Sequence, residues 1–505
     1  MTNTPTLSPV DYTTFISNFE AGLKEIFNKR NADDSRFSNR GFSGETLNAI
    51  MSFNPLSVSV PTEFGGRGVK VKECLGLLEA ASYESLPLSL IFGINFALFL
   101  EPLARYGQFK AKENTFKNFL ENKAMGGLMI SEPLYGSDAL SMQTSNVLDE
   151  NGNYFISGIK HWQGLTGMAD YWLVACRSKC PQGKLARDID VFLTDESVQG
   201  QKIVVEHYYK NNGLYPIPYG KNVLNLNVPA ENKLIPDSTG IKMLMDILHR
   251  SRMQFPGMAM GFLKRIMEEA HKYCSNRMIR GNSLLQFDQV QLQVASLQNA
   301  FTICSAMCNY SSKVSSFENN LALFGIHANT IKAYVTDLMQ SSAQTLTQLM
   351  GAEGYKIKSL GSRGIMDSRP FQIFEGPNEL LYSQISEAIS KDCQRKKSNT
   401  LFDYLSDFDL TNQSAQLFKE ETSFAADRNQ DQRKHVILGK ILSRVITTQF
   451  VLELEGDGFN KGLIQNAVDS MVIEVKNLYS SLKNGNQLKP IESFQEKSSW
   501  KTLTK

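Results

Sequence analysis

The chain has 505 residues, more than one hydrophobic core usually serves, so two to four packed regions are expected. With 42% hydrophobic and 21% charged residues, the composition is that of an ordinary globular protein and excludes a disordered chain. The formal net charge is +2 and like charges form no long run, which gives no support to a nucleic-acid-binding function.

The N-terminal residues show no basic region followed by an apolar one, so we expect no secretory signal. The most apolar stretch, residues 86–100, is interrupted by Ser89 and Asn95 and falls short of the roughly 20 residues that cross a bilayer. We therefore expect a buried helix there and no transmembrane segment. Seven cysteines without a disulfide-like or zinc-like spacing indicate a reducing compartment, so we expect a cytoplasmic protein without a bound metal.

Residues 1–126 are predicted to form an N-terminal helical domain. Ile91, Phe96 and Leu100 recur near helical spacing, and alternation with period two is scarce. The stretch VPTEFGGRG at residues 60–68 is predicted to be a loop. Neither this loop nor any other segment has the glycine pattern of a Rossmann or P-loop nucleotide site.

Residues 127–236 are predicted to form a β domain. Short runs rich in β-branched and aromatic residues alternate there with turn signals such as Asn151-Gly152 and Asn212-Gly213. This pattern is typical of a small antiparallel β-barrel or sandwich.

Helical patterns return in residues 237–392, where three long apolar stripes predict a C-terminal four-helix bundle. After a polar stretch, helical spacing resumes and predicts a further helical region over residues 400–505, here called the appendix. The predicted fold class is therefore α+β and mostly helical.

Four segments place residues with binding potential at the ends of predicted elements. In residues 129–138 (MISEPLYGSD), Ser137 follows a glycine that permits close approach to a ligand. Trp162 can cover a planar ring, Arg277 suits a phosphate, and Gln348 can bond a nucleotide-like group. Each segment alone also has a structural explanation, namely a turn, a core aromatic, a solvated arginine or a helix cap.

A fifth segment, residues 366–379 (MDSRPFQIFEGPNE), contains Glu375 between apolar residues and a Gly-Pro turn. A carboxylate held in such surroundings is poorly hydrated and therefore more basic, as a general base requires. Alone, an exposed glutamate in a turn explains the segment as well.

Together and in this order, ISEPLYGSD, GIKHWQGLTGMADYWLV, the R-x-x-x-G of residues 277–281, QLMGAEGY and IFEGPNE resemble the acyl-CoA dehydrogenase family. The resemblance covers about residues 20–390. It implies FAD bound between a helical domain, a β domain and a four-helix domain, in a homodimer or a dimer of dimers. The implied reaction is α,β-dehydrogenation of an acyl thioester on coenzyme A or an acyl carrier protein. The implied electron acceptor is an electron-transfer flavoprotein.

Carried over position by position, the resemblance makes Glu375 the base that takes the α-proton, with hydride transfer from the β-carbon to flavin N5. Some relatives place the base at the position of Ser251, which a serine cannot fill unaided. Substrate contacts are assigned to Ser137, His249, Arg252 and Gly376. Arg277 and Gln348 are expected to reach the FAD of the partner subunit. Cofactor contacts are assigned to Ile130, Ser131, Ser137, Trp162, Gly164, Arg277, Asp288, Gln348 and Gly351.

Five positions depart from the family pattern, one of them Ala352, which stands where the second glycine of a pair is usual. Gly164 and Pro377 stand where threonines often contact the flavin, Asp288 where a glutamine is usual, and His249 where an acidic residue often meets pantetheine. FAD binding is therefore expected with altered contacts. Coenzyme A as the thioester carrier is less firmly implied than the oxidation itself.

Two other functions stay open at this point: a flavin-dependent monooxygenase or oxidase on the same fold, which usually lacks the base, and a non-catalytic flavin-binding scaffold. For the appendix, packing on the protein's own surface is the simplest expectation. Contact with a membrane or a carrier protein is the alternative.

Overall fold

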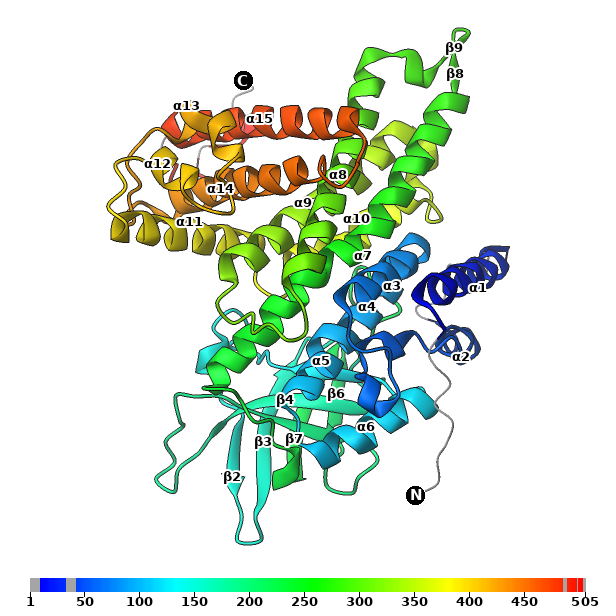
Figure 1. The fold of residues 1–505 in the computed structure, drawn as a ribbon, viewed down its shortest axis with the longest axis vertical. Coiled ribbons are helices and arrows are strands. Elements are labelled where there is room, and N and C mark those ends of the chain that lie inside the picture. Colours follow the sequence, from blue (N-terminus) through cyan, green and yellow to red (C-terminus); the bar gives the residue numbers. More distant parts are fainter. Residues whose placement is uncertain (1–9, 33–41, 485–487, 497, 503–505) are drawn as a thin grey trace.

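A computed structural model of the protein describes residues 10–32, 42–484, 488–496 and 498–502. Figure 1 shows the β domain at one end of the molecule, the helical bundle and the appendix at the other, and the N-terminal helices beside the junction. The order of the regions along the chain is helical, β, helical and helical, and the α+β, mostly helical class is confirmed.

The N-terminal region is built on a long buried helical rod. Ser85 caps this rod by accepting a hydrogen bond from the Leu88 N–H, and a π-helical turn interrupts it. The helices of this region are α1 (Tyr12–Ala32), α2 (Gly44–Met51), α3 (Val71–Glu84), α4 (Leu86–Asn95), the π turn η4 (Phe96–Leu100), α5 (Glu101–Tyr106) and α6 (Phe109–Glu121).

Two helical segments of the described chain are long and apolar enough to cross a membrane, judged by length and composition alone. They are Leu86–Tyr106 and Gln432–Glu453, and 94% and 78% of the most apolar 18 residues of each lie buried inside the fold. The buried helix expected near residue 86 is therefore present, and it reaches beyond the expected end at residue 100.

The β domain is a curled seven-stranded sheet in the order β1-β4-β2-β3-β7-β6, with β5 paired to β4. The pairs β1–β4 and β2–β4 are parallel, which corrects the purely antiparallel prediction. Strands that a short hairpin connects must pair antiparallel. Strands that are connected by a longer stretch of chain can pair in parallel. The strands are β1 (Gly126–Met129), β2 (Ser145–Leu148), β3 (Asn153–His161), β4 (Tyr171–Ser178), β5 (Asp190–Asp195), β6 (Val204–Tyr208) and β7 (Gly220–Pro229).

The bundle is organised around α7, a helix of 37 residues whose middle turns are buried all round between the N-terminal helices and the rest of the bundle. A short hairpin of β8 (Met278–Ile279) and β9 (Asn282–Ser283) joins α7 to α8 at the far end (Figure 1). The bundle helices are α7 (Gly240–Asn276), α8 (Asp288–Val314), α9 (Gly325–Met350), α10 (Leu360–Ser368) and α11 (Asn378–Arg395).

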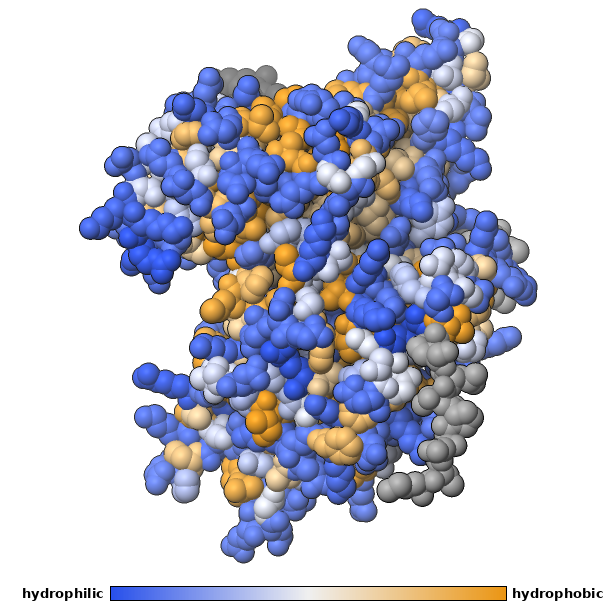
Figure 2. All heavy atoms as spheres, viewed as in Figure 1, coloured by the Kyte–Doolittle hydropathy of each residue, from blue (hydrophilic) through white to orange (hydrophobic). Residues whose placement is uncertain are grey.

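The appendix packs on the bundle, as the simplest expectation had it. Helix α14 contacts α11, α8 and α9, and α15 contacts α8 and α14. Figure 2 shows apolar residues gathered around this junction, whereas the visible surface of the β domain is mostly hydrophilic. The helices of the appendix are α12 (Leu401–Ser406), α13 (Lys419–Thr422), α14 (Gln432–Glu453) and α15 (Lys461–Asn484).

Candidate active site

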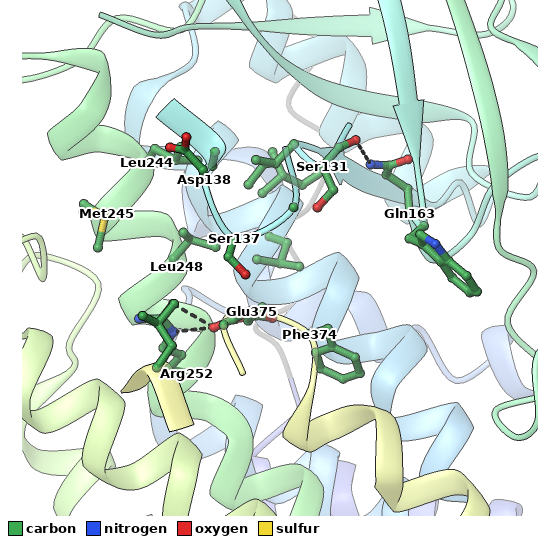
Figure 3. Close-up of a pocket in the computed structure, with 18 of the residues that line it drawn as sticks. Ser131, Ser137, Asp138, Gln163, Leu244, Met245, Leu248, Arg252, Phe374 and Glu375 are labelled. Carbon is green, nitrogen blue, oxygen red and sulfur yellow. Dashed lines mark hydrogen bonds between the residues drawn. The ribbon is translucent and has the colours of Figure 1, made fainter. Parts of the chain in front are cut away.

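A cavity of about 420 Å³ lies where the N-terminal helices, the β domain and the bundle meet. Its size falls within the range of small-molecule sites, roughly 300–1,000 Å³. Three unlike regions supply its walls: α4, the loops 130–140 and 162–164 of the β domain, and α7 with the turn 374–376 of the bundle (Figure 3).

Eight of the residues assigned from the sequence line this one cavity, although they are spread over about half of the chain. Ser137 of the β domain and Glu375 of the bundle both line it (Figure 3). The eight residues are Ile130, Ser131, Ser137, Trp162, Gly164, Arg252, Glu375 and Gly376.

The turn that carries Glu375 has an unusual backbone. Glu375 has φ +53° and Gly376 has φ +93°. A residue with a β-carbon adopts such a conformation only where its surroundings hold it there. The surroundings here are two cations, because Arg252 donates from Nε (3.1 Å) and Nη2 (2.8 Å) to the Glu375 carbonyl, and Lys332 Nζ donates to the Gly376 carbonyl at 2.8 Å. Two successive peptide carbonyls are thus held by buried positive charges.

The Glu375 carboxylate is held at one oxygen only. Its Oε1 accepts a hydrogen bond from Ser251 Oγ at 2.8 Å, and its Oε2 is buried without a hydrogen-bond partner among the described residues. Both cations of the turn are engaged with carbonyl oxygens and not with this carboxylate. Oε2 is therefore available to accept a proton from a molecule in the cavity.

Burial and charge act in opposite directions on this carboxyl group. Burial raises the pKa of Glu375 above its ordinary value, while Arg252, the Ser251 hydroxyl and Lys332 oppose that rise. Burial also lowers the pKa of Lys332, to about 7. A carboxylate with a raised pKa beside an apolar cavity has the basicity that proton abstraction from carbon requires.

The rest of the cavity wall is largely apolar, with a few polar groups at the β-domain side. Neither the Ser131 nor the Ser137 hydroxyl has a hydrogen-bond partner within the described chain. Trp162 has φ +60° and is 52% exposed; its indole packs against Tyr209 at 4.3 Å between ring centres and leaves the rest of the ring open to a ligand. The apolar residues of the wall include Leu90, Ile94, Leu98, Leu128, Leu140, Ile241, Leu244, Met245, Leu248, Phe374, Leu380 and Leu381.

A buried ion pair fixes the loop that carries these serines. Lys160 Nζ lies 3.0 Å from Glu132 Oε1 and donates to the Ile130 carbonyl at 2.8 Å. Gln163 Nε2 donates to the Ser131 carbonyl at 3.2 Å. Because these contacts satisfy the carbonyl groups of the loop, its geometry is set before any ligand binds.

Four assigned residues lie away from the cavity, toward the far end of the bundle. Arg277 is the C-cap of α7, Asp288 is the first residue of α8, Gln348 is in the last turn of α9, and Gly351 follows that helix with φ +58°. All four are exposed. Their assigned role toward the cofactor of a partner subunit stays a prediction.

His249 also lies outside the cavity lining. Its Nδ1 is 2.8 Å from the Leu321 carbonyl, and burial lowers its pKa to about 4. A substrate contact at His249 stays a prediction. Its neighbours in this structure are the loop residues that precede α9.

Two residues of the site were not found from the sequence. Lys332 lies beside the apolar stripe of α9, where a single lysine is normally taken to belong to the neighbouring, solvent-exposed face of the helix. Asn378 opens α11 directly after the turn, and its Oδ1 accepts a hydrogen bond from Lys332 at 3.0 Å. A charged residue within an apolar helical stripe is the signal that points to a buried partner of this kind.

Comparisons with known proteins agree with this architecture. Residues 127–225 match the model of the acyl-CoA dehydrogenase middle domain, and residues 238–390 match that of the acyl-CoA dehydrogenase C-terminal domain. The chain belongs to the acyl-CoA dehydrogenase family. The resemblance inferred from the five sequence segments is thereby confirmed.

Among curated relatives, the mitochondrial very long-chain specific acyl-CoA dehydrogenase of Rattus norvegicus is 24% identical over 73% of this chain and 56% of its own length. An acyl-CoA dehydrogenase of Bacillus subtilis is 24% identical over 64% of this chain and 84% of its own length. The chain thus spans little more than half the length of the very long-chain relatives that it matches.

Solved structures of the family share the fold. Butyryl-CoA dehydrogenase from Megasphaera elsdenii matches 74% of this chain and 98% of its own, with a TM-score of 0.65 and 20% identity. An acyl-CoA dehydrogenase from Bacillus anthracis, complexed with FAD, matches 99% of this chain and 93% of its own, with a TM-score of 0.74 and 17% identity. Because the second match covers nearly the whole chain, the appendix is part of a fold that occurs in another member of the family.

Proposed function

We propose that this protein is an FAD-dependent acyl-thioester dehydrogenase in which Glu375 takes the α-proton of the substrate. One observation carries the proposal: a buried carboxylate with one unpartnered oxygen faces an apolar cavity, in a backbone turn held by two cations. Membership of the acyl-CoA dehydrogenase family and the titles of relatives in complex with FAD or FADH2 support it.

The β-domain side of the cavity fits a flavin. Ser131 and Ser137 present hydroxyls without partners in the described chain, and Trp162 offers a half-exposed aromatic face. These residues, with Ile130 and Gly164, would hold the ring system of FAD. When bound there, FAD supplies the acceptor for the hydride that leaves the β-carbon.

The other groups of the site follow from the needs of the reaction. The α-carbon of a thioester gives up its proton only if the negative charge that builds on the carbonyl oxygen is stabilised. Glu375 Oε2 receives the proton, and the Glu375 backbone N–H, which has no hydrogen-bond partner in the described chain, is available to that carbonyl oxygen. Arg252 and Lys332 hold the turn, and the leucines of α4, α7 and α11 keep water away from the acyl chain.

The carrier of the thioester is coenzyme A or an acyl carrier protein. Most relatives have names that refer to acyl-CoA, whereas one structural neighbour is a prolyl acyl carrier protein oxidase (TM-score 0.64, 18% identity). Because of that neighbour, a flavin oxidase on the same fold is a second candidate function. Glu375 favours the dehydrogenase, with an electron-transfer flavoprotein as the proposed acceptor and the cytoplasm as the proposed location.

We further propose a homodimer formed through the far end of the bundle. Exposed apolar side chains cluster on the β8–β9 hairpin and on the segment after α9, close to Arg277 and Gln348. The most exposed of them are Met278 (56%), Tyr355 (84%) and Ile357 (68%), and Leu292 (65%) lies in the second turn of α8.

The test is to reconstitute the purified protein with FAD and add a panel of acyl-CoA and acyl-carrier thioesters without oxygen. The parent should lose its yellow colour with at least one of them. Glu375→Gln should stay yellow, whereas Glu379→Gln, an exposed glutamate four residues further on, should behave like the parent. Bleaching of Glu375→Gln at the parental rate contradicts the base assignment, and a protein that takes up no FAD contradicts the proposal as a whole.

A further inference from the structure

Arg444 of α14 connects the appendix to the bundle through a buried contact. Its guanidinium carbon lies 3.9 Å from the centre of the Tyr334 ring, and its Nη1 donates to Tyr382 Oη at 3.1 Å. Its Nε pairs with Glu474 of α15 at 3.0 Å. Arg444 is 8% exposed and Tyr382 is fully buried, so this contact lies inside the molecule and not on its rim.

From Tyr382 the hydrogen bonds continue toward the turn that carries Glu375. Tyr382 Oη donates to Asp337 Oδ2 at 2.7 Å, and Asn378 Nδ2 donates to Asp337 Oδ1 at 2.8 Å. Lys332 Nζ then donates both to Asn378 Oδ1 at 3.0 Å and to the Gly376 carbonyl at 2.8 Å. A chain of hydrogen bonds, each with a donor and an acceptor, thus runs from the appendix to the residue after Glu375.

We infer that the appendix helps to position the proposed catalytic turn, and that Arg444, Tyr382 and Asp337 are positioning residues that act through Asn378 and Lys332. The effect on catalysis rests on the function proposed above. The effect on the turn does not, because it follows from the contacts alone.

The physical basis is the way in which side chains of α9 hold the start of α11. Pro377, its N-cap, provides no side-chain hydrogen bond. Asn378, 3% exposed, replaces such a cap by bonding Ala333, Thr336 and Asp337 of α9. In a poorly solvated interior, a hydrogen-bond network is rigid only while all of its members are satisfied. Loss of the Tyr382 hydroxyl takes the donor from Asp337 Oδ2, and loss of Arg444 takes the donor from Tyr382. Gln372 still donates to Asp337 Oδ1, and Asn378 keeps its bonds to Ala333 and Thr336. We therefore expect Asp337, Asn378 and the Gly376 carbonyl to become looser without being released.

Two variants and one control test this inference. Tyr382→Phe removes a single oxygen and keeps the ring beside Arg444. Arg444→Gln removes the charge and the stacking on Tyr334. The control is Gln449→Ala on the same helix, because Gln449 is also buried but bonds only Gln413, Ser414 and Glu453, all within the appendix.

The primary measurement is amide hydrogen exchange of the peptide that covers residues 371–381, read at the hydrogen-bonded amides of Phe374 and Leu381. We expect exchange to become at least roughly threefold faster in Tyr382→Phe and Arg444→Gln and to stay parental in Gln449→Ala. Parental exchange in Tyr382→Phe, or equal acceleration in the control, overturns the inference. If Arg444→Gln does not fold, Tyr382→Phe decides alone.

The second measurement is the rate of flavin bleaching by an acyl thioester under single-turnover conditions. Because small misplacements of a reacting group reduce rates strongly, we expect a loss of roughly tenfold in the bleaching rate at saturating thioester. The half-saturating thioester concentration and the FAD content should stay within about twofold of the parent. A parent protein that is not bleached by any thioester contradicts the proposed function, while the exchange measurement still decides the positioning role. Accelerated exchange with an unchanged bleaching rate overturns the catalytic part of the inference.

Discussion

The bundle contains two buried clusters of charge that use the same residue types in different ways. In the first, α7 supplies Asp246 and Arg250, which pair at 3.4 Å, and Tyr106 donates to the other oxygen of Asp246 at 2.9 Å. In the second, α7 supplies Arg252, two residues further on, which bonds the Glu375 carbonyl instead of a carboxylate. Asp246, Arg250 and Arg252 are buried and Glu375 is half-buried, and only the second cluster faces the cavity.

The difference shows what separates a structural carboxylate from a reactive one. Both oxygens of Asp246 have partners, so a change in its charge would break several contacts at once. Glu375 keeps one oxygen without a partner in the described chain, because its cations are engaged with peptide carbonyls. Glu101 shows that burial alone is no criterion: its pKa is also raised and its Oε2 lacks a hydrogen bond, but it lies against Arg250 and does not line the cavity.

The largest effect that separates the clusters is expected at Glu375. Glu375→Gln should lower the rate of flavin bleaching by about 10²–10⁴-fold, the usual contribution of a general base. The free energy of unfolding should stay parental or rise slightly, because an ionisable group is replaced by a neutral one in a poorly solvated position. Stopped-flow bleaching and urea unfolding of the same samples measure both quantities. A marked loss of stability would show that this carboxylate is structural after all.

The opposite result is expected at Asp246. Asp246→Asn removes the nearer of the two carboxylates beside the buried Arg250, at 3.4 Å, and leaves Glu101 at 3.9 Å. Removal of one member of a buried ion pair costs about 3–5 kcal/mol, which is here an upper bound. The bleaching rate of the folded fraction should stay within about threefold of the parent, because Asp246 does not line the cavity. Urea unfolding and a bleaching assay of the same samples measure the two quantities. A loss of less than about 1 kcal/mol in the free energy of unfolding would contradict a structural role for this cluster.

The sequence predicted most of the architecture because local patterns encode it. Helical stripes, short β-branched runs and Gly-Pro turns placed the four regions in order, and turn residues beside apolar stretches pointed to Ser137 and Glu375. The parallel pairing of β1 and β4 was not predicted, since strand order depends on contacts between distant segments that no local pattern records.

The supporting residues of the site were hidden for a related reason. Lys332 and Arg444 occur in helical stretches where a charged residue usually marks a solvated face. Their burial depends on which helices pack over them, and for Arg444 that includes α11 and α15. Only the assembled fold shows that both side chains belong to one hydrogen-bond network that runs through α9 and α11.

A smaller effect is expected from the charge of Lys332. Its pKa is about 7 in the fold against an ordinary 10.5, so between these values the unfolded chain binds more protons than the folded one. The free energy of unfolding should therefore rise with pH across that window, with a slope of at most about 1.4 kcal/mol per pH unit from this group. Below pH 7 the group is charged in both states and contributes no slope.

Lys332→Met should remove that slope and also weaken the hold on the Gly376 carbonyl. Urea unfolding at a series of pH values measures it, and Lys391→Met, an exposed lysine of α11, serves as the control. If the stability of the parent and of Lys332→Met depends on pH in the same way above pH 7, burial does not lower the pKa of Lys332. The turn is then held by a permanent charge.

The smallest effect concerns the hydrogen bond between Ser251 and Glu375. The base acts only when deprotonated, and burial raises its pKa above the ordinary 4.5, so the bleaching rate should fall on the acid side through a pKa higher than that value. Ser251 Oγ favours the charged carboxylate through the 2.8 Å bond. Ser251→Ala should therefore move the acid limb of the rate profile upward by about one pH unit, whereas Ser251→Thr, which keeps the hydroxyl, should leave it in place. An unmoved limb in Ser251→Ala would mean that this bond does not set the charge of the base. Access to the cavity alone would then distinguish Glu375 from Asp246.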